Sequence, residues 1–266
     1  MVERVALITG CGKLDGIGAA CGRALASAGV IVVVSSVPRK DGRGSPDLYT
    51  LVEQLNAAGG KASAVTGDVS VEKDAADMVS ETVQRHGRLD ILVNNAAAAK
   101  GKDRAAIEDV PLEAWEQQMA INATGVFLMC RAAVTPMRKQ GWGRIISISS
   151  TAAKVGSKNT AVYSATKAAV SGFTRALAIE LGPYGITVNA VCPFGVVTGR
   201  AMETAAQTVG SSDPEALEAF FAAKAQNIPV RRLARTEEVG AMVAYLASEA
   251  SGFVTGQSLS ICGGTT

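Results

Sequence analysis

Short runs of apolar residues recur along this chain, and longer amphipathic stretches separate them. The runs are mostly apolar throughout instead of alternating, which is typical of strands buried on both faces of a parallel sheet. They span residues 4–9, 30–35, 61–67, 89–95, 143–150, 186–192 and 258–262. Helical periodicity fills the intervals at 17–28, 46–58, 71–86, 112–139, 161–182 and 236–248. The alternation predicts a doubly wound α/β fold, with a seven-stranded, mainly parallel sheet and helices on both faces.

No linker and no shift in composition divides the 266 residues, so we expect a single domain over 1–266. Hydrophobic residues make up 48% of the chain and charged residues 19%, which is enough apolar material for a large core. Residues 199–230 stand apart from the alternation, are rich in alanine and contain few cations. An insertion after a late strand is expected to form a lid over a substrate site. Its few cations argue against a polyanionic substrate.

Composition also argues against several classes of partner. The net charge of +2 and the lack of a basic run predict no nucleic-acid partner. The five cysteines include no C-x-x-C pair and His86 is the single histidine, so we expect no metal site. Scattered cysteines of this kind are typical of a reducing, cytoplasmic location. No signal peptide or long apolar span is apparent, so no membrane association is expected.

The stretch TGCGKLDGIG, residues 9–18, places four glycines directly after the first apolar run. Their G-x-G-x-x-x-G-x-G spacing differs from the common G-x-G-x-x-G. The loop can begin at Thr9 with two extra residues, or at Cys11 with cysteine in place of threonine. The apolar run ends at Thr9, which favours the first register. Because glycines and a helix N-terminus together suit a diphosphate, the loop is predicted to bind a dinucleotide.

The end of the second apolar run indicates which dinucleotide is preferred. Sites for NAD commonly place an acid there, about 20 residues past the loop. Here the run ends in VSSVPRK, with Ser36 at the position of the acid and Arg39 and Lys40 just beyond it. A missing acid and nearby cations favour a 2′-phosphate, so NADP(H) is expected in preference to NAD(H). Asp15, beside the glycine loop, argues weakly for the opposite preference.

The stretch SSTAAKVGSKNTAVYSATK contains the residue types for acid–base chemistry. Tyr163 and Lys167 are four residues apart and share one face of a predicted helix. A lysine ammonium beside a phenol favours the phenolate, and such a tyrosine can act as general acid or base on a carbonyl or alcohol. Ser150 closes the preceding apolar run, at the strand end where ligands bind in open α/β sheets. Its hydroxyl can donate a hydrogen bond to the same substrate oxygen.

With these motifs in order, the sequence resembles the short-chain dehydrogenase/reductase family over essentially its whole length, and its β-ketoacyl-reductase-like, Y-x-x-x-K members in particular. The family's T-G-x-x-x-G-x-G loop, the GDV, NNAA and NATGVF segments, the thirteen-residue step from Ser150 to Tyr163 and the NAVCPFGVVT segment all have counterparts. The resemblance implies a Rossmann-type fold, a nicotinamide cofactor and a set of site residues.

The implied catalytic residues are Asn122, Ser150, Tyr163 and Lys167, with Asn122 holding a water in a proton relay. Asp68 is expected at the adenine ring, and Val196 and Thr198 at the nicotinamide carboxamide. The complete set of expected cofactor contacts, including the cation inferred above, is Thr9, Gly10, Gly16, Ile17, Gly18, Ser36, Arg39, Asp68, Val69, Asn95, Ala96, Tyr163, Lys167, Pro193, Val196 and Thr198. The expected substrate pocket includes Ala152, Phe194 and Met202.

Three positions depart from the family pattern. The first loop is two residues longer between Gly10 and Gly16, and it can bulge outward if the segment 13–15 faces solvent. Ala97 and Phe194 each replace a glycine. Phe194 is expected either to line the substrate pocket or to pack in a turn.

The expected function is NAD(P)-dependent hydride transfer between the nicotinamide and a carbonyl or secondary alcohol, with Tyr163 as general acid or base. The expected partner is a small-to-medium, partly apolar substrate molecule. Reduction of a β-ketoacyl thioester and oxidation of a sugar or polyol are alternatives within the enzyme class. A non-catalytic dinucleotide-binding sensor or scaffold is an alternative of another kind. The resemblance also implies a homotetramer, or a dimer, built from the two longest helices and the last strand.

Overall fold

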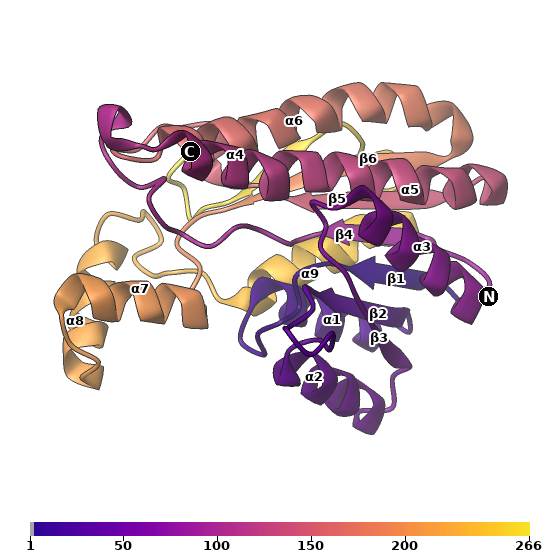
Figure 1. Ribbon diagram of the computed structural model, residues 1–266, viewed down its shortest axis with the longest axis horizontal. Helices are drawn as coiled ribbons and strands as arrows, with labels where there is room; N and C mark the ends of the chain where they lie inside the picture. Colours follow the sequence, from indigo (N-terminus) through magenta and orange to yellow (C-terminus); the bar gives the residue numbers. More distant parts are fainter. Residues whose placement is uncertain (1–2) are drawn as a thin grey trace.

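Seven parallel strands form one central sheet in the computed structural model, which describes residues 3–266 (Figure 1). The spatial order is β3-β2-β1-β4-β5-β6-β7, and every pairing is parallel. The chain therefore builds outward from β1 to β3, returns to place β4 beside β1, and builds outward again. The strands are β1 (Val5–Ile8), β2 (Ile31–Ser36), β3 (Ala62–Thr66), β4 (Ile91–Asn94), β5 (Gly143–Ile148), β6 (Ile186–Pro193) and β7 (Ser258–Ile261).

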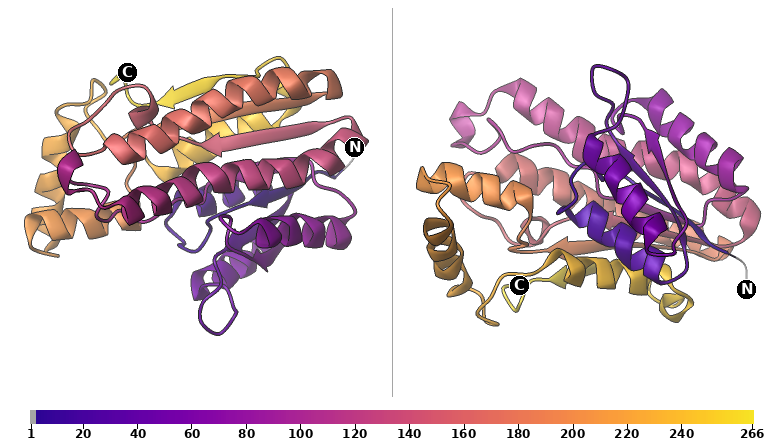
Figure 2. Two further views of the ribbon diagram at one scale, coloured as in Figure 1. Left: turned by 45° about the horizontal axis from the view of Figure 1, so that its top comes forward. Right: turned by 90° about the horizontal axis from the view of Figure 1, so that it is seen from below.

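Helices cover both faces of the sheet, which confirms the predicted doubly wound fold (Figures 1 and 2). One hydrophobic core lies under α3 (Glu72–His86), α5 (Gly125–Gln140) and α6 (Ala161–Leu181). The other lies under α1 (Ile17–Ser27), α2 (Pro46–Ala57) and α9 (Thr236–Ala247). Short 3₁₀ turns occur at Ile107–Asp109, Thr151–Ala153, Gly182–Tyr184 and Glu249–Ser251.

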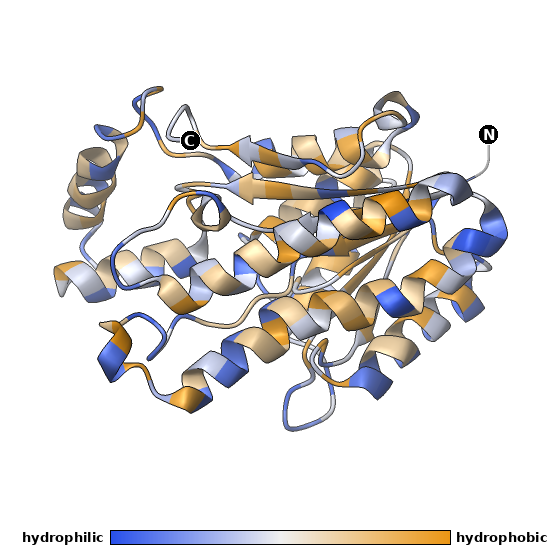
Figure 3. Ribbon diagram, turned by 90° about the horizontal axis from the view of Figure 1, so that it is seen from above, coloured by the Kyte–Doolittle hydropathy of each residue, from blue (hydrophilic) through white to orange (hydrophobic). Residues whose placement is uncertain are grey.

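Successive side chains of each strand enter opposite cores. In β1, Val5 and Leu7 join the core under α3, α5 and α6, whereas Ala6 and Ile8 join the core under α1, α2 and α9. Side chains of a strand point alternately to the two faces of a sheet, so a strand covered on both sides needs apolar residues at every position. This requirement explains the unbroken apolar runs. The surface helices instead show mixed hydrophobic and hydrophilic residues (Figure 3).

The helix predicted over 112–139 is interrupted. α4 (Leu112–Met119) passes into a π-helical turn (Ala120–Thr124), and α5 follows directly. The π turn contains the buried Asn122, whose side chain bonds to neighbouring segments. Single π turns inside α-helices are rare and frequently occur at functional sites.

The helical run Leu112–Gln140 is apolar enough, by length and composition alone, to be a candidate membrane span. A core helix passes the same test, so this run does not overturn the expectation of no membrane association. α5 places Val126, Met129 and Met137 in the core against the sheet. Burial in the core of a folded domain accounts for the apolar character of this run.

Residues 199–230 form two helices beyond the carboxyl ends of the strands, shown in orange in Figure 1. α7 (Gly199–Val209) begins with Thr198, whose side chain accepts a hydrogen bond from the amide of Ala201. α8 (Pro214–Ala225) begins with Asp213, whose carboxylate accepts one from the amide of Ala216. The two helices pack on one another and extend past the end of the sheet (Figure 2).

α1 and α9 approach each other closely at Gly240. A Cβ atom there would lie 2.8 Å from the main-chain oxygen of Ala20, which a rigid helix backbone cannot avoid. We expect Gly240→Ala to lower the free energy of unfolding by about 1–3 kcal/mol, as overpacking commonly does, measured by chemical denaturation. Gly182→Ala is the matched control, because Gly182 has a φ of −51° and open space around its Cβ position. Equal stability of the two variants would contradict the close approach.

Candidate active site

The predicted site residues gather at the carboxyl ends of the strands. The glycine loop follows β1, the NNAA segment follows β4, Ser150 follows β5, and 194–198 follow β6. β1 and β4 are neighbours in the sheet although their connections leave in opposite directions. In open α/β sheets this topological switch point forms the crevice that receives a ligand.

The glycine loop packs directly against the loop after β4. Gly10 has a φ of +74°, and a Cβ there would lie 2.7 Å from Cα of Ala96. A Cβ at Gly18 would lie 2.6 Å from Nδ2 of Asn95. Both positions therefore require glycine, Gly10 for conformation as well as space. This places the loop in the register that begins at Thr9.

Two side chains fasten the loops together. The Thr9 hydroxyl accepts hydrogen bonds from the amides of Asn95 and Ala96, each at 3.1 Å. The Asn95 side chain donates from Nδ2 to the main-chain oxygens of Thr9 (2.8 Å) and Gly10 (3.0 Å). Thr9 is 1% exposed, so its side chain acts within the protein and shapes the loop for a cofactor.

The first turn of α1 suits a diphosphate. Gly16 precedes the helix without a side-chain cap, and the first turn contains no acidic residue. The first amides of the helix, beginning near Ile17, therefore keep donors and the positive end of the helix dipole for an anion. Together with the close-packed glycines, this arrangement fits the diphosphate of a dinucleotide.

The enlarged part of the loop is exposed and also contacts α7. Nζ of Lys13 lies 2.7 Å from Oε1 of Glu203 on α7. The Asp15 carboxylate lies at the start of the same helix, where a Cβ at Gly199 would overlap it. The enlarged loop therefore contacts α7 while Lys13 and Asp15 stay exposed, which agrees with the expectation that the segment 13–15 can bulge outward.

The adenosine end of the expected cofactor site contains both predicted polar residues. Ser36 is buried, and its Oγ accepts a hydrogen bond from the amide of Ser45 at 3.3 Å. Arg39 is exposed and lines a hollow of about 450 Å³ with Lys40 and Asp41. The half-buried Asp68 uses one oxygen, Oδ1, to accept from the amide (2.9 Å) and hydroxyl (2.6 Å) of Ser70. Val69 is buried against Gly125.

α6 places Tyr163 and Lys167 on one face. Nζ of Lys167 lies 5.8 Å from the centre of the Tyr163 ring and donates a hydrogen bond to the main-chain oxygen of Ile148 at 2.8 Å. β5 ends at Ile148, two residues before the predicted limit, and Ser150 instead caps the 3₁₀ turn that follows. Oγ of Ser150 accepts from the amide of Ala152 at 3.1 Å, which leaves its hydroxyl hydrogen for another acceptor.

Burial changes the charge balance of Lys167. Its side chain is 3% exposed, and burial lowers the pKa of its ammonium group below the ordinary value. The negative charge of Tyr163, in its ionised form, opposes this shift. Desolvation disfavours the charged form of an amine. The protonation of Lys167 therefore depends on the negative charge that an ionised Tyr163 places beside it.

The Asn122 side chain is wholly engaged by the protein. Oδ1 accepts from the amide of Ala98 at 2.9 Å. Nδ2 donates to Gln118 at 2.7 Å and to the Thr166 hydroxyl at 3.2 Å. Gln118 and Thr166 were missed by the sequence analysis; the four-residue step from Gln118 to Asn122 was the available signal. A relay through Asn122 would therefore use its main chain, which the π turn displaces from regular helical bonding.

The predicted cofactor contacts at the end of β6 and just after it lie in three different local structures. Pro193 closes the strand, Val196 forms a parallel bridge to Ala234, and Thr198 caps α7. Ala152 is half-buried in the turn after Ser150, and Met202 is 37% exposed on α7.

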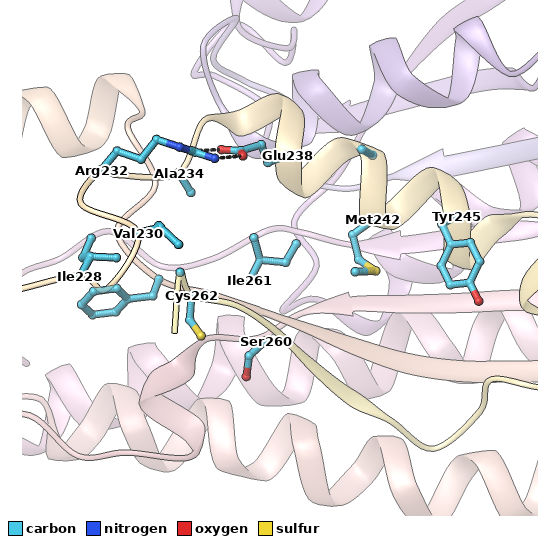
Figure 4. Close-up of a pocket in the computed structure, with 13 residues that line it drawn as sticks. Ile228, Val230, Arg232, Ala234, Glu238, Met242, Tyr245, Ser260, Ile261 and Cys262 are labelled. Carbon is cyan, nitrogen blue, oxygen red and sulfur yellow. Dashed lines mark hydrogen bonds and ion pairs between the residues drawn. The ribbon is translucent and has the colours of Figure 1, made fainter. Parts of the chain in front are cut away.

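Phe194 lines a cavity of about 580 Å³ at the edge formed by β7 and α9 (Figure 4). The other lining residues come from the segment after α8, from α9 and from the chain end, and include Ile228, Val230, Met242, Tyr245, Ile261 and Cys262. Neither Ser150, Tyr163 nor Lys167 lines it. Phe194 thus faces a different cavity from the one expected for the substrate.

Among residues 3–266, no three His, Cys, Asp or Glu side chains form a group that could hold a metal ion.

Two arginines near Tyr163 were also missed. Cζ of Arg104 lies 4.2 Å from the centre of the Tyr163 ring. Arg200, in the first turn of α7, donates from Nη1 to the main-chain oxygen of Ala98 at 3.2 Å. Arg104 belongs to an irregular loop that has no periodic signal, so only the folded chain brings it to the site.

Known proteins show the same architecture. Residues 10–266 match the family model described as enoyl-(acyl carrier protein) reductase. The monensin polyketide synthase putative ketoacyl reductase of Streptomyces virginiae is 40% identical over 266 residues, covering 98% of this chain and 97% of that protein. The trans-4-hydroxycyclohexanecarboxylate dehydrogenase of Sinomonas cyclohexanicum is 37% identical over 272 residues, covering 100% and 94%. A crystal structure of an actinorhodin polyketide ketoreductase variant with NADPH has a TM-score of 0.87 and 36% identity, covering 98% and 97%.

Fold and site together define an oxidoreductase that uses a nicotinamide dinucleotide. The chain belongs to the short-chain dehydrogenase/reductase family, as the resemblance of its motifs predicted.

Proposed function

We propose that this protein is an NADP-preferring carbonyl reductase or secondary-alcohol dehydrogenase for a small-to-medium, partly apolar substrate. The observation that supports this most directly is the face of α6, where Tyr163 lies one turn from the buried Lys167 beside Ser150. The intact set of acid–base residues argues against a non-catalytic sensor or scaffold. Ketoacyl reduction is a second candidate, because a putative ketoacyl reductase is similar to nearly the whole chain.

The residues of the chain supply positioning and proton transfer. The bound nicotinamide supplies or accepts the hydride. Tyr163 gives its phenol proton to the carbonyl oxygen during reduction and removes the alcohol proton during oxidation. The Ser150 hydroxyl donates to the same oxygen, because its bond with Ala152 uses the oxygen as acceptor and leaves the O–H free. Lys167 stabilises the phenolate of Tyr163 by charge, and the Asn122 main chain and a water connect Lys167 to solvent.

The cofactor is proposed to lie along the crevice from the α1 N-terminus to α6. Gly10, Gly16, Ile17 and Gly18 hold the diphosphate, while Thr9, Asn95 and Ala96 fix the shape of the loops around it. Ser36 and Arg39 face the adenosine ribose with its 2′-phosphate, and Asp68 and Val69 border the adenine. Pro193, Val196 and Thr198 border the nicotinamide. The whole chain acts as one domain, and α7 and α8 act as the lid over a substrate that Ala152 and Met202 help to enclose.

Replacement of the proposed proton donor tests the reaction type. We expect Tyr163→Phe to lower kcat for carbonyl reduction by about 10²–10⁴-fold, the usual contribution of a positioned acid or base. Its affinity for NADPH, measured by fluorescence titration, should stay close to that of the unmodified protein. Surviving turnover would show that Tyr163 does not transfer the proton. Cofactor binding by the unmodified protein without turnover of any ketone or alcohol in a broad panel would favour the sensor.

The cofactor preference depends on Arg39. We expect Arg39→Ala to raise KM for NADPH roughly five- to tenfold, about 1–1.4 kcal/mol, and to leave KM for NADH nearly unchanged. Arg43→Ala is the matched control, because Arg43 is in the same loop but does not line the hollow beside Arg39. Steady-state kinetics with both cofactors measures the effect. Equal efficiency of the unmodified protein with NADPH and NADH would contradict the preference.

A cytoplasmic homotetramer is also part of the proposal. All five cysteines are free, in keeping with a reducing compartment. The outer faces of α5 and α6 expose Phe127 (43%) and Ile179 (81%), apolar surface that a second copy can cover. We expect light scattering to give a tetramer of about four chain masses, and Ile179→Glu to yield a smaller species. A monomeric unmodified protein at micromolar concentration would contradict this assembly.

A further inference from the structure

We infer that the substrate bears an anionic group, and that a group of four cations binds it, of which Arg104 lies against the Tyr163 ring: Lys100, Arg104, Arg200 and Lys224, the cationic cluster. The inference rests on the proposed function, because it names the substrate class of the same site. The preferred anion is a carboxylate of the substrate itself, so the substrate is a keto acid or the matching hydroxy acid.

Arg104 is fixed at the reacting end of the site. Its guanidinium lies over the Tyr163 ring at 4.2 Å, and its Nε lies 3.0 Å from Oδ2 of Asp103. Asp103 is 1% exposed, and its Oδ1 accepts from the amide of Gly101 at 2.8 Å. The aromatic ring therefore covers one face of the guanidinium, and the buried carboxylate lies close to it without a hydrogen bond between Oδ2 and Nε. The other guanidinium nitrogens remain for a ligand, in the fork geometry that matches a carboxylate.

The lid supplies two further cations. Arg200 reaches from the first turn of α7 to the main-chain oxygen of Ala98, whose amide bonds to Asn122. Lys224 on α8 lies over the Phe220 ring, with Nζ 4.4 Å from its centre. The lid by itself has few cations, as the sequence indicates, but it meets the segment after β4, which contributes Lys100 and Arg104.

The charges of these side chains act on one another. Burial lowers the pKa of Lys100, and the positive charges of Arg104, Lys224 and Arg200 lower it further. Asp103 opposes them, but it is already paired with Arg104. Glu203 also faces Arg200, and Lys13 binds its carboxylate at 2.7 Å. Positive charge therefore remains in excess at the site, and a bound anion would relieve the repulsion.

The position of the cluster favours a short spacer between anion and carbonyl. Arg104 touches the ring of the tyrosine that is proposed to bond the carbonyl oxygen. An anion on this arginine would lie only a few atoms from the reacting carbon, as in a small keto acid. The phosphate of a long carrier arm has the same anionic chemistry but would lie much farther from the carbonyl.

Matched substrates test the inference. The unmodified enzyme is assayed with 3-, 4- and 5-oxohexanoate, with their methyl esters, with acetoacetyl-coenzyme A and with its neutral N-acetylcysteamine analogue. We expect kcat/KM for at least one acid to exceed that for its ester by tenfold or more, equivalent to about 1.4 kcal/mol. If substitutions in the cluster lowered kcat/KM for the coenzyme A thioester but not for the acids, the anion would belong to a carrier arm. This result would overturn the keto-acid assignment.

Variants separate the cluster from the catalytic residues. Lys100→Ala and Lys224→Ala should each lower the acid-to-ester ratio of kcat/KM at least fivefold, mainly through KM of the acid. Lys73→Ala, which removes a cation from the remote and exposed start of α3, is the matched control and should not change the ratio. An increase of KM for NADPH in the cluster variants, with an unchanged ratio, would show that the cluster binds the cofactor and would overturn the inference.

Binding without turnover separates this inference from the proposed reaction. Hexanoate, which has no ketone, should bind the NADP⁺ complex of the unmodified protein in calorimetry, and Lys100→Ala/Lys224→Ala should weaken it at least tenfold. This result would hold even if Tyr163→Phe kept its activity. Equal binding of hexanoate to both proteins, or an acid-to-ester ratio of one or less, would overturn the anionic site.

Discussion

The pairing of the loops after β1 and β4 is the constraint on which the rest of the site depends. The Thr9 hydroxyl and the Asn95 amide tie these loops together through four hydrogen bonds of 2.8–3.1 Å. Gly10 and Gly18 let the backbones approach within the space that a Cβ would occupy. Because the loops cannot separate, the first turn of α1 points its free amides at one fixed place. The same loop after β4 leads through Ala98 to Asn122, so the proposed cofactor cradle and the proposed proton relay share one support.

The enlarged glycine loop gains a second role from its contacts. Lys13 and Asp15 both meet α7, one through Glu203 and the other at Gly199. Helix α7 also contains Arg200, which bonds beside Asn122. The loop that is proposed to bind the diphosphate is thus in direct contact with the helix that is proposed to enclose the substrate. The ion pair between Lys13 and Glu203 is exposed and contributes little to the free energy of unfolding. Its main effect is to fix the position of α7 relative to the loop.

The fold was predictable because its signal is local and repeated: most strand positions are apolar, since each strand packs against both cores. Tyr163 and Lys167 were predictable because both belong to one helix and their spacing is local. Neither the π turn at Asn122 nor the early end of β5 was predictable, since helical and strand periodicity tolerate a shift of one or two residues. The partner of Lys13 lies 190 residues away in sequence, and only the fold brings Glu203 to it.

The cationic cluster shows how charge can be concentrated without one continuous basic motif. Lys100 and Arg104 belong to the short basic stretch KGKDR, whereas Arg200 and Lys224 come from α7 and α8 more than 90 residues later, so only the fold brings the four together. Two contacts bring part of the cluster together: Arg104 lies over the Tyr163 ring beside the buried Asp103, and Arg200 at the start of α7 bonds to Ala98. A substrate that neutralises this charge would also bridge the lid to the fixed loops. Recognition of the anion and closure of α7 and α8 over the carbonyl would then be one event, because the same contacts produce both.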